Sequence, residues 1–270
     1  MAARNRRSNP EKKVDPGRVD SEAAPAFGRL SGKTAAVTGG NRGIGLAIAR
    51  ALVAEGCNVL ITGRDPVALK NAKLELAASA STVNPHPEVF AERCQVQKPA
   101  SVAAAFAKVK KRWGRLDILV NNAGISQALF PVEETPIHLW KSVIDINLTG
   151  LFLCTRSAVS LMGRGSTIVN MLSITAKTSV PKFAAYNASK SGALGFTQTL
   201  REELIPKGIR VMALMPGATD TEIWEQFWPD APRKKMLDPK SVADAVLYAV
   251  LLPPEANLSE LLLVPMEGVL

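Results

Sequence analysis

Three side chains in the segment 173–190, SITAKTSVPKFAAYNASK, have the types and spacing that carbonyl–alcohol chemistry requires. Tyr186 and Lys190 are four residues apart in a stretch of helical composition, so we expect them on one helix face, about one turn apart. A phenol has an ordinary pKa near ~10, but a neighbouring ammonium favours the phenolate and lowers that pKa, which makes a Tyr a usable acid or base. Ser173 follows the apolar run TIVNML, where a strand would deliver its hydroxyl to a cleft and to the substrate oxygen that Tyr186 protonates.

The Tyr–Lys pair also has an ordinary explanation, an amphipathic helix face without chemistry. The chain has only two Tyr, and a Lys four residues after one of them arises by chance about one time in twenty at ordinary Lys usage. The interpretation of the pair therefore depends on the other motifs in the chain.

A glycine-rich turn near the start of the chain predicts a dinucleotide site. Lys33–Thr38 (KTAAVT) has the pattern of a short apolar strand, the sequence GGNRGIG follows it, and LAIARALVAEG then has the pattern of a helix. Gly39, Gly43 and Gly45 therefore lie where a tight turn lets a pyrophosphate approach the N–H groups and dipole of a helix N-terminus. Opening a βαβ unit, this turn predicts dinucleotide binding.

The residues after the second expected strand, Asn58–Thr62, bear on the type of dinucleotide. An acid about ~20 residues beyond the glycines suits a free ribose 2′-hydroxyl, whereas an Arg suits a 2′-phosphate. Asp65 followed by Pro66 is also a helix N-cap with Pro at the first helical position. We therefore assign Asp65 to capping and Arg64, with Arg42 as a second cation, to the 2′-phosphate. This predicts a preference for NADP(H), with NAD(H) possible and two solvated arginines as the competing interpretation.

The rest of the chain alternates strand and helix patterns. Strands are expected near Val89–Val96, Asp117–Asn121, Ser166–Ser173, Ile209–Leu214 and Leu261–Val264, and helices over Ala100–Arg112, Pro136–Met162 (capped by Thr135) and from Pro239 (capped by Asp238). This alternation predicts an α/β fold with a doubly wound parallel sheet and helices on both faces, in a single domain over residues 28–270. A chain of 270 residues is long enough for one such core.

Aromatic side chains cluster after the strand that ends near Pro216. Trp224, Phe227 and Trp228 stand in a region rich in loop signals. They fit either the buried core of a short helix or a lid over an apolar substrate, and we favour the lid because ligand pockets are mostly apolar.

The net charge of +9 raises the question of nucleic-acid binding. The first 29 residues hold seven Lys or Arg against four acids, but no recognition-helix, zinc-finger or aromatic-plus-basic pattern accompanies them. Residues 1–27 are therefore predicted to be a disordered, solvated basic extension, and nucleic-acid binding is not expected.

Targeting and metal signals are absent from the sequence. No apolar run reaches the ~18 residues that span a membrane, and no signal core is visible, so a cytoplasmic location is expected. The three cysteines, Cys57, Cys94 and Cys154, are odd in number and far apart, which favours reduced thiols. Neither of the two histidines, His86 and His138, has a ligand-spaced partner, so no metal site is expected.

Taken together, these motifs resemble the short-chain dehydrogenase/reductase family. They occur in that family's order and spacing from about Leu30 to Val264: Thr38-Gly39-x-x-x-Gly43-x-Gly45, Asn121-Asn122-Ala123-Gly124, Asn147, Ser173, Tyr186-x-x-x-Lys190 and Pro216-Gly217. The resemblance implies a Rossmann fold and an NAD(P)-dependent oxidoreductase, usually a homodimer or homotetramer assembled through the two long helices beside the active site.

The resemblance also implies a role for each site residue. Tyr186 is the general acid in carbonyl reduction and the base in alcohol oxidation, while Lys190 lowers its pKa and bonds the nicotinamide ribose. Ser173 orients the substrate oxygen, and Asn147 holds a water that links Lys190 to solvent in a proton relay. The other implied cofactor contacts are Gly39, Asn41, Arg42, Gly43, Ile44, Gly45 and Arg64, then Asn122, Ala123 and Gly124 at the adenosine-side ribose, and Pro216, Gly217, Thr219 and Thr221 at the carboxamide.

Two departures from the family pattern narrow these expectations. Where relatives often carry an Asp that bonds the adenine amine, this chain reads Cys94-Gln95-Val96, and Gln95 is the candidate substitute acceptor. The C-terminus, NLSELLLVPMEGVL, lacks the glycine–aspartate–double-glycine ending of many acyl-carrier-protein reductases. The sequence predicts an NADP(H)-dependent oxidoreductase that interconverts a carbonyl and a secondary alcohol. A 3-oxoacyl thioester reductase and a dinucleotide-binding regulator without turnover are the alternatives.

Overall fold

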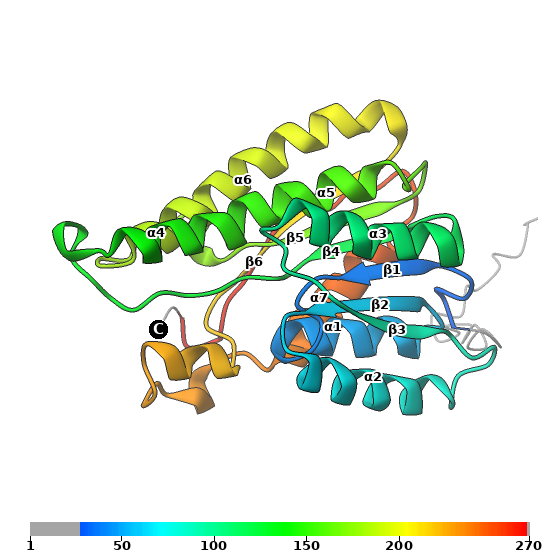
Figure 1. Ribbon diagram of the computed structural model, residues 1–270, viewed down its shortest axis with the longest axis horizontal. Coiled ribbons are helices and arrows are strands. Elements are labelled where there is room, and N and C mark those ends of the chain that lie inside the picture. The colour runs from blue at the N-terminus through cyan, green and yellow to red at the C-terminus, as the bar shows by residue number, and fades with distance from the viewer. Residues whose placement is uncertain (1–27, 269–270) are drawn as a thin grey trace, which may run out of the picture.

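The computed structural model describes residues 28–268, which form one parallel sheet with helices on both faces (Figure 1). The predicted basic extension, residues 1–27, lies outside the described residues. The strands are β1 (Thr34–Val37), β2 (Asn58–Gly63), β3 (Val89–Arg93), β4 (Ile118–Asn121), β5 (Thr167–Met171), β6 (Arg210–Pro216) and β7 (Glu260–Leu263). The α-helices are α1 (Gly43–Ala54), α2 (Pro66–Ala80), α3 (Pro99–Trp113), α4 (Ile137–Ile144), α5 (Gly150–Val159), α6 (Ala184–Leu204) and α7 (Pro239–Leu251).

The order of the strands is β3-β2-β1-β4-β5-β6-β7, and every neighbouring pair is parallel. The direction of progression along the sheet reverses between β1 and β4, so the predicted doubly wound fold is confirmed. The loops after these two strands diverge to opposite faces, which opens a crevice at their carboxyl ends. The glycine turn and the Asn122-Ala123-Gly124 turn both lie at this crevice.

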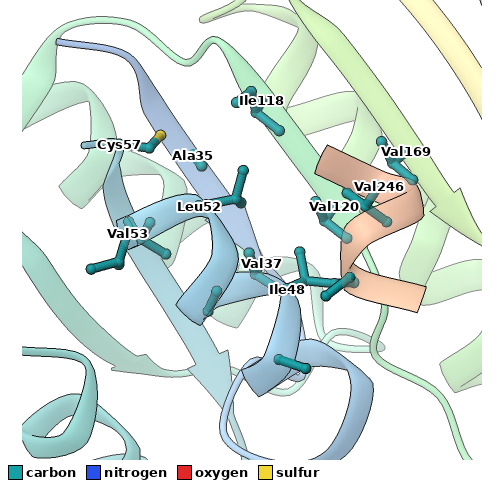
Figure 2. Packing of buried hydrophobic residues seen from close by; sticks show 14 of the residues in the cluster. Ala35, Val37, Ile48, Leu52, Val53, Cys57, Ile118, Val120, Val169 and Val246 are labelled. Atoms are coloured by element: carbon teal, nitrogen blue, oxygen red, sulfur yellow. The ribbon is translucent and has the colours of Figure 1, made fainter. Parts of the chain in front are cut away.

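The core consists of two apolar layers, one on each face of the sheet. Along β1, Ala35 and Val37 pack towards α1, α2 and α7, where Ile48 and Leu52 of α1 meet them (Figure 2). Ala36 points to the other face and packs with residues of α3, α5 and α6. Because helices cover both faces, the strands are apolar at nearly every position instead of alternating, as expected for a parallel sheet.

The helix predicted over 136–162 is interrupted. A π-helical turn, Asp145–Thr149, separates α4 from α5. The expected cap from Thr135 is also wrong, since its hydroxyl bonds the carbonyl of Pro131 and α4 starts without a side-chain cap. π turns inside α-helices often occur at functional sites, and this one contains Asn147.

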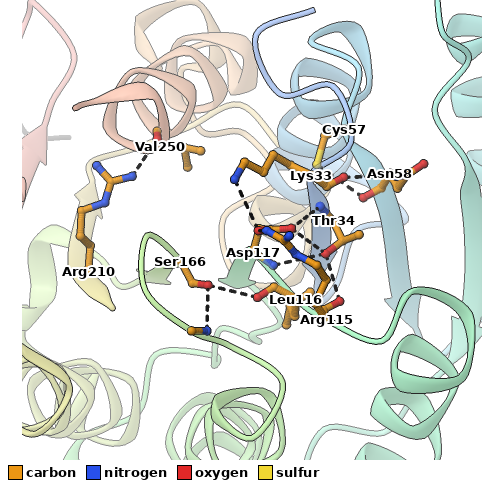
Figure 3. A network of polar contacts seen from close by, with 11 residues as sticks. Lys33, Thr34, Cys57, Asn58, Arg115, Leu116, Asp117, Ser166, Arg210 and Val250 are labelled. Atoms are coloured by element: carbon orange, nitrogen blue, oxygen red, sulfur yellow. Dashed lines mark hydrogen bonds and ion pairs between the residues drawn. The ribbon is translucent and has the colours of Figure 1, made fainter. Parts of the chain in front are cut away.

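Polar contacts join the amino ends of the strands, at the opposite end of the sheet from the crevice. The carboxylate of Asp117, just before β4, accepts hydrogen bonds from the N–H of Thr34 at 2.9 Å and from the Thr34 hydroxyl at 3.0 Å, and it also pairs with Arg115 (Figure 3). Burial acts to raise the pKa of Asp117, but these hydrogen bonds outweigh it and hold the pKa below its usual value. At the start of β6, Arg210 donates to the Val250 carbonyl at the end of α7. Within residues 28–268 no helix is both long and apolar enough to cross a bilayer.

Candidate active site

A cavity of about 700 Å³ opens at the carboxyl ends of the strands and brings most of the predicted site residues together. Ser173, Tyr186 and Lys190 line it. So do the predicted cofactor contacts Gly39, Asn41, Arg42, Gly43, Ile44, Arg64, Asn122, Ala123, Gly124, Pro216, Gly217, Thr219 and Thr221. Gly45 and Asn147 do not line the cavity. Gly45 packs against the lining residue Gly39, and Asn147 bonds the lining residue Ile125.

The glycine turn forms the cavity wall at the start of α1. Gly43, the first residue of this helix, has φ +52°, a left-handed conformation that side chains disfavour. A Cβ on Gly45 would lie 2.3 Å from the carbonyl oxygen of Gly39 and 2.5 Å from Nδ2 of Asn122, so only glycine fits there. The turn therefore presents the backbone of a helix N-terminus to the cavity, which suits the pyrophosphate of a dinucleotide.

Asn122 joins the turns after β1 and β4. Its side-chain Nδ2 donates to the carbonyls of Thr38 at 3.0 Å and Gly39 at 3.1 Å. In return, the Thr38 hydroxyl accepts from the backbone N–H groups of Asn122 and Ala123, each at 3.0 Å. These hydrogen bonds hold the two halves of the crevice at a fixed separation.

Of the charged residues after β2, Asp65 caps a helix as predicted. The Asp65 carboxylate accepts from the N–H groups of Val67 at 2.8 Å and Ala68 at 3.2 Å, which makes it the N-cap of α2. Asp65 does not line the cavity. Arg42 and Arg64 are exposed and both line it, so this part of the crevice presents two cations.

Ser173 and Tyr186 approach each other across the cavity wall. Ser173 follows β5 and caps a short 3₁₀ turn, Ile174–Ala176, by accepting from the N–H of Thr175 at 3.2 Å. Burial of the phenol raises the pKa of Tyr186 to about 12, and a hydrogen bond with Ser173 acts in the opposite direction. Both side chains line the same cavity, where one substrate oxygen can contact both hydroxyls.

The expectation that Lys190 lowers the pKa of Tyr186 is not met in this structure. The Lys190 ammonium donates to the Met171 carbonyl at 3.1 Å and lies 5.5 Å from the centroid of the Tyr186 ring. Burial lowers the pKa of Lys190 to about 8. The cause of the difference is that burial disfavours the charged form of each group, and this effect exceeds their mutual attraction at this separation.

Asn147 braces the site from behind the cavity. Its Oδ1 accepts from the N–H of Ile125 at 2.8 Å, and its Nδ2 donates to the Ile125 carbonyl at 2.9 Å and to the Ser189 hydroxyl at 3.1 Å. That hydroxyl donates to the Tyr186 carbonyl at 2.7 Å. Asn147 thus connects the loop after β4 to the helix turn that carries Tyr186.

Sequence reasoning missed Gln127, a second residue that hydrogen-bonds the first turn of α6, which carries Tyr186. Gln127 is 2% exposed, and its Oε1 accepts from the N–H of Tyr186 at 2.8 Å. Its Nε2 donates to the Lys182 carbonyl at 3.3 Å, just before α6 begins. No local pattern could have revealed this contact, because it joins residues 59 positions apart.

Two further predictions concern the cavity walls. Trp224, Phe227 and Trp228 all line the cavity, within and just after the 3₁₀ segment Glu222–Gln226.

Gln95, the proposed substitute contact for adenine, is not among the lining residues. Its neighbours Cys94, Val96 and Gln97 line the cavity instead, because Gln95 leads into the loop before α3 and its N–H donates to the Ser101 hydroxyl at 3.0 Å.

Comparison with known proteins agrees with this geometry. Residues 33–232 match the family model described as short chain dehydrogenase. The chain is 39% identical over 203 residues to 2-dehydro-3-deoxy-L-rhamnonate dehydrogenase (NAD(+)) of a Sphingomonas species, covering 74% of this chain and 77% of that protein. It is 36% identical over 205 residues to 3beta-hydroxysteroid dehydrogenase of Mediterraneibacter gnavus, covering 76% and 72%.

Solved structures show the same likeness. A short chain dehydrogenase from Burkholderia cenocepacia in complex with NADP superposes with a TM-score of 0.78 at 30% identity, covering 87% of this chain and 98% of that chain. A metagenomic short-chain oxidoreductase in complex with NADP superposes with a TM-score of 0.75 at 30% identity, covering 88% and 99%. The chain therefore belongs to the short-chain dehydrogenase family and is an oxidoreductase of that family.

Proposed function

We propose that this protein interconverts a ketone and a secondary alcohol with NADP(H) as the preferred cofactor. The observation that carries the proposal is the shared cavity: its wall holds Ser173, Tyr186 and Lys190, and its far end is the glycine turn at the start of α1. A dinucleotide bound along the crevice would place its nicotinamide near the phenol and its phosphates at the turn.

The cofactor supplies the hydride when bound, and the side chains of the chain handle the oxygen and the proton. In reduction, the Tyr186 phenol gives its proton to the carbonyl oxygen, while the Ser173 hydroxyl donates a hydrogen bond to the same oxygen and stabilises its developing negative charge. In alcohol oxidation the Tyr186 phenolate takes the proton back. We assign Lys190 to stabilising that phenolate in the reacting complex, because burial raises the pKa of Tyr186 in this structure and the phenolate needs a positive charge nearby.

The remaining parts of the site fit a proton path. Tyr186 gives up its proton in each reduction and must regain one from solvent. Lys190 is buried beside the phenol, so we propose that this proton passes by way of Lys190. We assign Asn147 to this relay. Because its side chain is occupied by Ile125 and Ser189, a relay water at this residue would be held by its backbone.

The charges near the adenosine end support NADP(H). Arg42 and Arg64 are exposed cations that line the cavity, and the carboxylate of Asp65 caps α2. The Burkholderia relative was solved with NADP, whereas the Sphingomonas relative is named for NAD(+). The pair of arginines supports the NADP precedent, because a 2′-phosphate is recognised by Arg and a 2′-hydroxyl by an acid.

We also propose that the protein is a homo-oligomer that uses the outer faces of α5 and α6. Phe152 of α5 is 42% exposed and its ring contacts that of Phe196 of α6, with centroids 6.0 Å apart. A monomer by light scattering at micromolar concentration would contradict this proposal.

Absorbance at 340 nm tests the proposed activity directly. NADPH and NADH oxidation should be followed with a panel of ketones, β-keto esters and quinones. The proposal predicts turnover with at least one ketone and a higher kcat/KM with NADPH than with NADH. Tight NADPH binding without turnover of any compound would instead favour a dinucleotide-binding regulator.

A further inference from the structure

A continuous row of aromatic rings runs from the candidate acid to Trp228, which is 42% exposed. The ring of Tyr186 lies 5.0 Å from that of Phe183, which lies 5.5 Å from that of Phe227. Phe227 is 5.0 Å from Trp224, and Trp224 is 6.0 Å from Trp228. All five rings line the cavity, so together they form an aromatic wall that begins at Tyr186.

Hydrogen bonds and an ion pair hold residues 219–221, just before the segment that carries Trp224, Phe227 and Trp228. The indole Nε1 of Trp224 donates to the Thr219 carbonyl at 2.8 Å. Arg233 pairs with Asp220 and donates to the Thr221 carbonyl at 2.6 Å. Because the only polar atom of the Trp224 ring is occupied by the backbone, the ring offers the cavity an apolar surface.

Three cations among the described residues line the cavity. Arg42 and Arg64 belong to the glycine turn and the end of β2, and the Lys190 ammonium lies 5.5 Å from the centroid of the Tyr186 ring, at the inner end of the row. The remaining charged lining residue is Glu222, an exposed acid on the same segment as Trp224. Among residues 28–268, the cavity wall at the outer rings therefore has an acid and no lining cation, since the nearby Arg233 pairs with Asp220 and does not line the cavity. This disfavours a carboxylate or phosphate on the substrate.

The wall beside this row is apolar as well. Leu129 from the loop after β4 is 47% exposed, and Val180 before α6 is 39% exposed, and both line the cavity together with Ile223. Exposed aliphatic side chains beside a row of rings bind a rigid apolar body by burying its surface.

We infer that the substrate is an uncharged ketone or alcohol that carries an aromatic or alicyclic ring next to the reacting carbon, and that Phe183, Trp224 and Phe227 bind this ring. The inference rests on the proposed function and specifies its substrate class. The ring packs against the row of aromatics while its carbonyl oxygen reaches Tyr186 and Ser173.

Two ketones of the same shape test the charge argument. 4-Methylacetophenone and 4-acetylbenzoate share ring and carbonyl and differ by a methyl group against a carboxylate. The inference predicts a kcat/KM for NADPH-dependent reduction that is on the order of 100-fold higher for the methyl compound, because the carboxylate loses its hydration without gaining a cation. Equal rates, or a preference for the carboxylate, would overturn the inference.

Variants of the row test the binding surface. Trp224→Ala and Phe227→Ala should each lower the ratio of kcat/KM for 4-methylacetophenone to that for butan-2-one by roughly tenfold, the size of one aromatic contact. Trp140→Ala is the matched control, because Trp140 is a 37% exposed tryptophan of α4 that does not line the cavity. The control should leave the ratio unchanged. An equal loss in all three variants would overturn the assignment.

The same measurements separate failure of the inference from failure of the proposed function. Reduction of butan-2-one without reduction of 4-methylacetophenone would leave the oxidoreductase activity standing and overturn the ring site. Failure to reduce any of the three ketones, together with no quenching of tryptophan fluorescence by 4-methylacetophenone in the presence of NADP⁺, would overturn both. Quenching that is lost in Trp224→Ala supports the ring site independently of turnover.

Discussion

The side-chain oxygen of Gln127 accepts a hydrogen bond from the backbone N–H of Tyr186 at 2.8 Å. Phe183, the N-cap residue of α6, has no side-chain cap of its own. A buried glutamine from the loop after β4 therefore satisfies an N–H group in the first turn of the helix that carries the candidate acid. The position of the Tyr186 phenol depends on this distant contact.

Replacing Gln127 tests whether the contact positions Tyr186. Gln127→Met removes the acceptor and leaves a buried N–H unpaired, which costs about 1–3 kcal/mol. We expect kcat for ketone reduction to fall about tenfold while the NADPH dissociation constant changes less than threefold. Steady-state kinetics and fluorescence titration would measure the two quantities.

Gln127→Glu separates positioning from a general loss of stability. Burial raises the pKa of a carboxyl at this site, and its protonated form can accept from the Tyr186 N–H and donate to the Lys182 carbonyl as the amide does. We therefore expect kcat near that of the wild type at low pH and a fall as pH rises through that pKa. If both variants lose thermal stability but keep wild-type kcat and pH profile, Gln127 only supports the fold.

Arg42 and Arg64 should set the preference for NADPH. Removing either guanidinium deletes a charge-assisted contact with the 2′-phosphate, which weakens NADPH binding about 10- to 100-fold and leaves NADH binding within threefold. Dissociation constants of Arg42→Ala and Arg64→Ala for both cofactors would check this. Asp65→Asn preserves the helix cap and serves as the control. Weaker NADH binding in that control would return Asp65 to the cofactor site.

The lowered pKa of Lys190 gives the reaction a pH limit. Its ammonium predominates below about pH 8 and is lost as pH rises through that value. Because kcat/KM for NADPH reports groups of the free enzyme, it should be flat below the pKa and fall about tenfold per pH unit above it. Lys190→Met should be slower and should lack this inflection. A wild-type inflection in the variant would assign it to another group.

Gly45 should be intolerant of a methyl group for steric reasons. Gly45→Ala forces an atom within 2.3 Å of the Gly39 carbonyl, which should cost about 1–3 kcal/mol of unfolding free energy and weaken dinucleotide binding. Gly195→Ala is the matched control, because Gly195 lies exposed inside α6 with nothing within 4 Å of its added Cβ. The control should gain about 0.5–1 kcal/mol. Equal thermal shifts in both variants would contradict this account.

Local patterns predicted those parts of the fold and site that depend on neighbouring residues. The glycine turn, the cap at Asp65 and the Tyr186–Lys190 spacing each follow from residues within one turn or loop. The same holds for the apolar runs of the strands, whose register the hydrophobic pattern and the connections determine. Strand ends differ from the predicted ones by at most three residues, as boundaries usually do.

Contacts between distant segments could not be predicted from the sequence. The π turn at Asn147 bonds Ile125 and Ser189, and Gln127 reaches Tyr186 across 59 residues. The direction of the Lys190 ammonium depends on its hydrogen bond to the Met171 carbonyl, and its pKa depends on burial. These features depend on tertiary packing, which no local spacing encodes.

Tyr186→Phe is the most direct test of the central claim, that the Tyr186 phenol carries the proton. The variant keeps the ring that packs on Phe183 and removes only the hydroxyl. NADPH binding by fluorescence should stay within threefold of wild type, while ketone-dependent NADPH oxidation at 340 nm should fall by about 10²–10⁴-fold. Wild-type turnover in Tyr186→Phe, with any ketone that the wild-type protein reduces, would contradict the account.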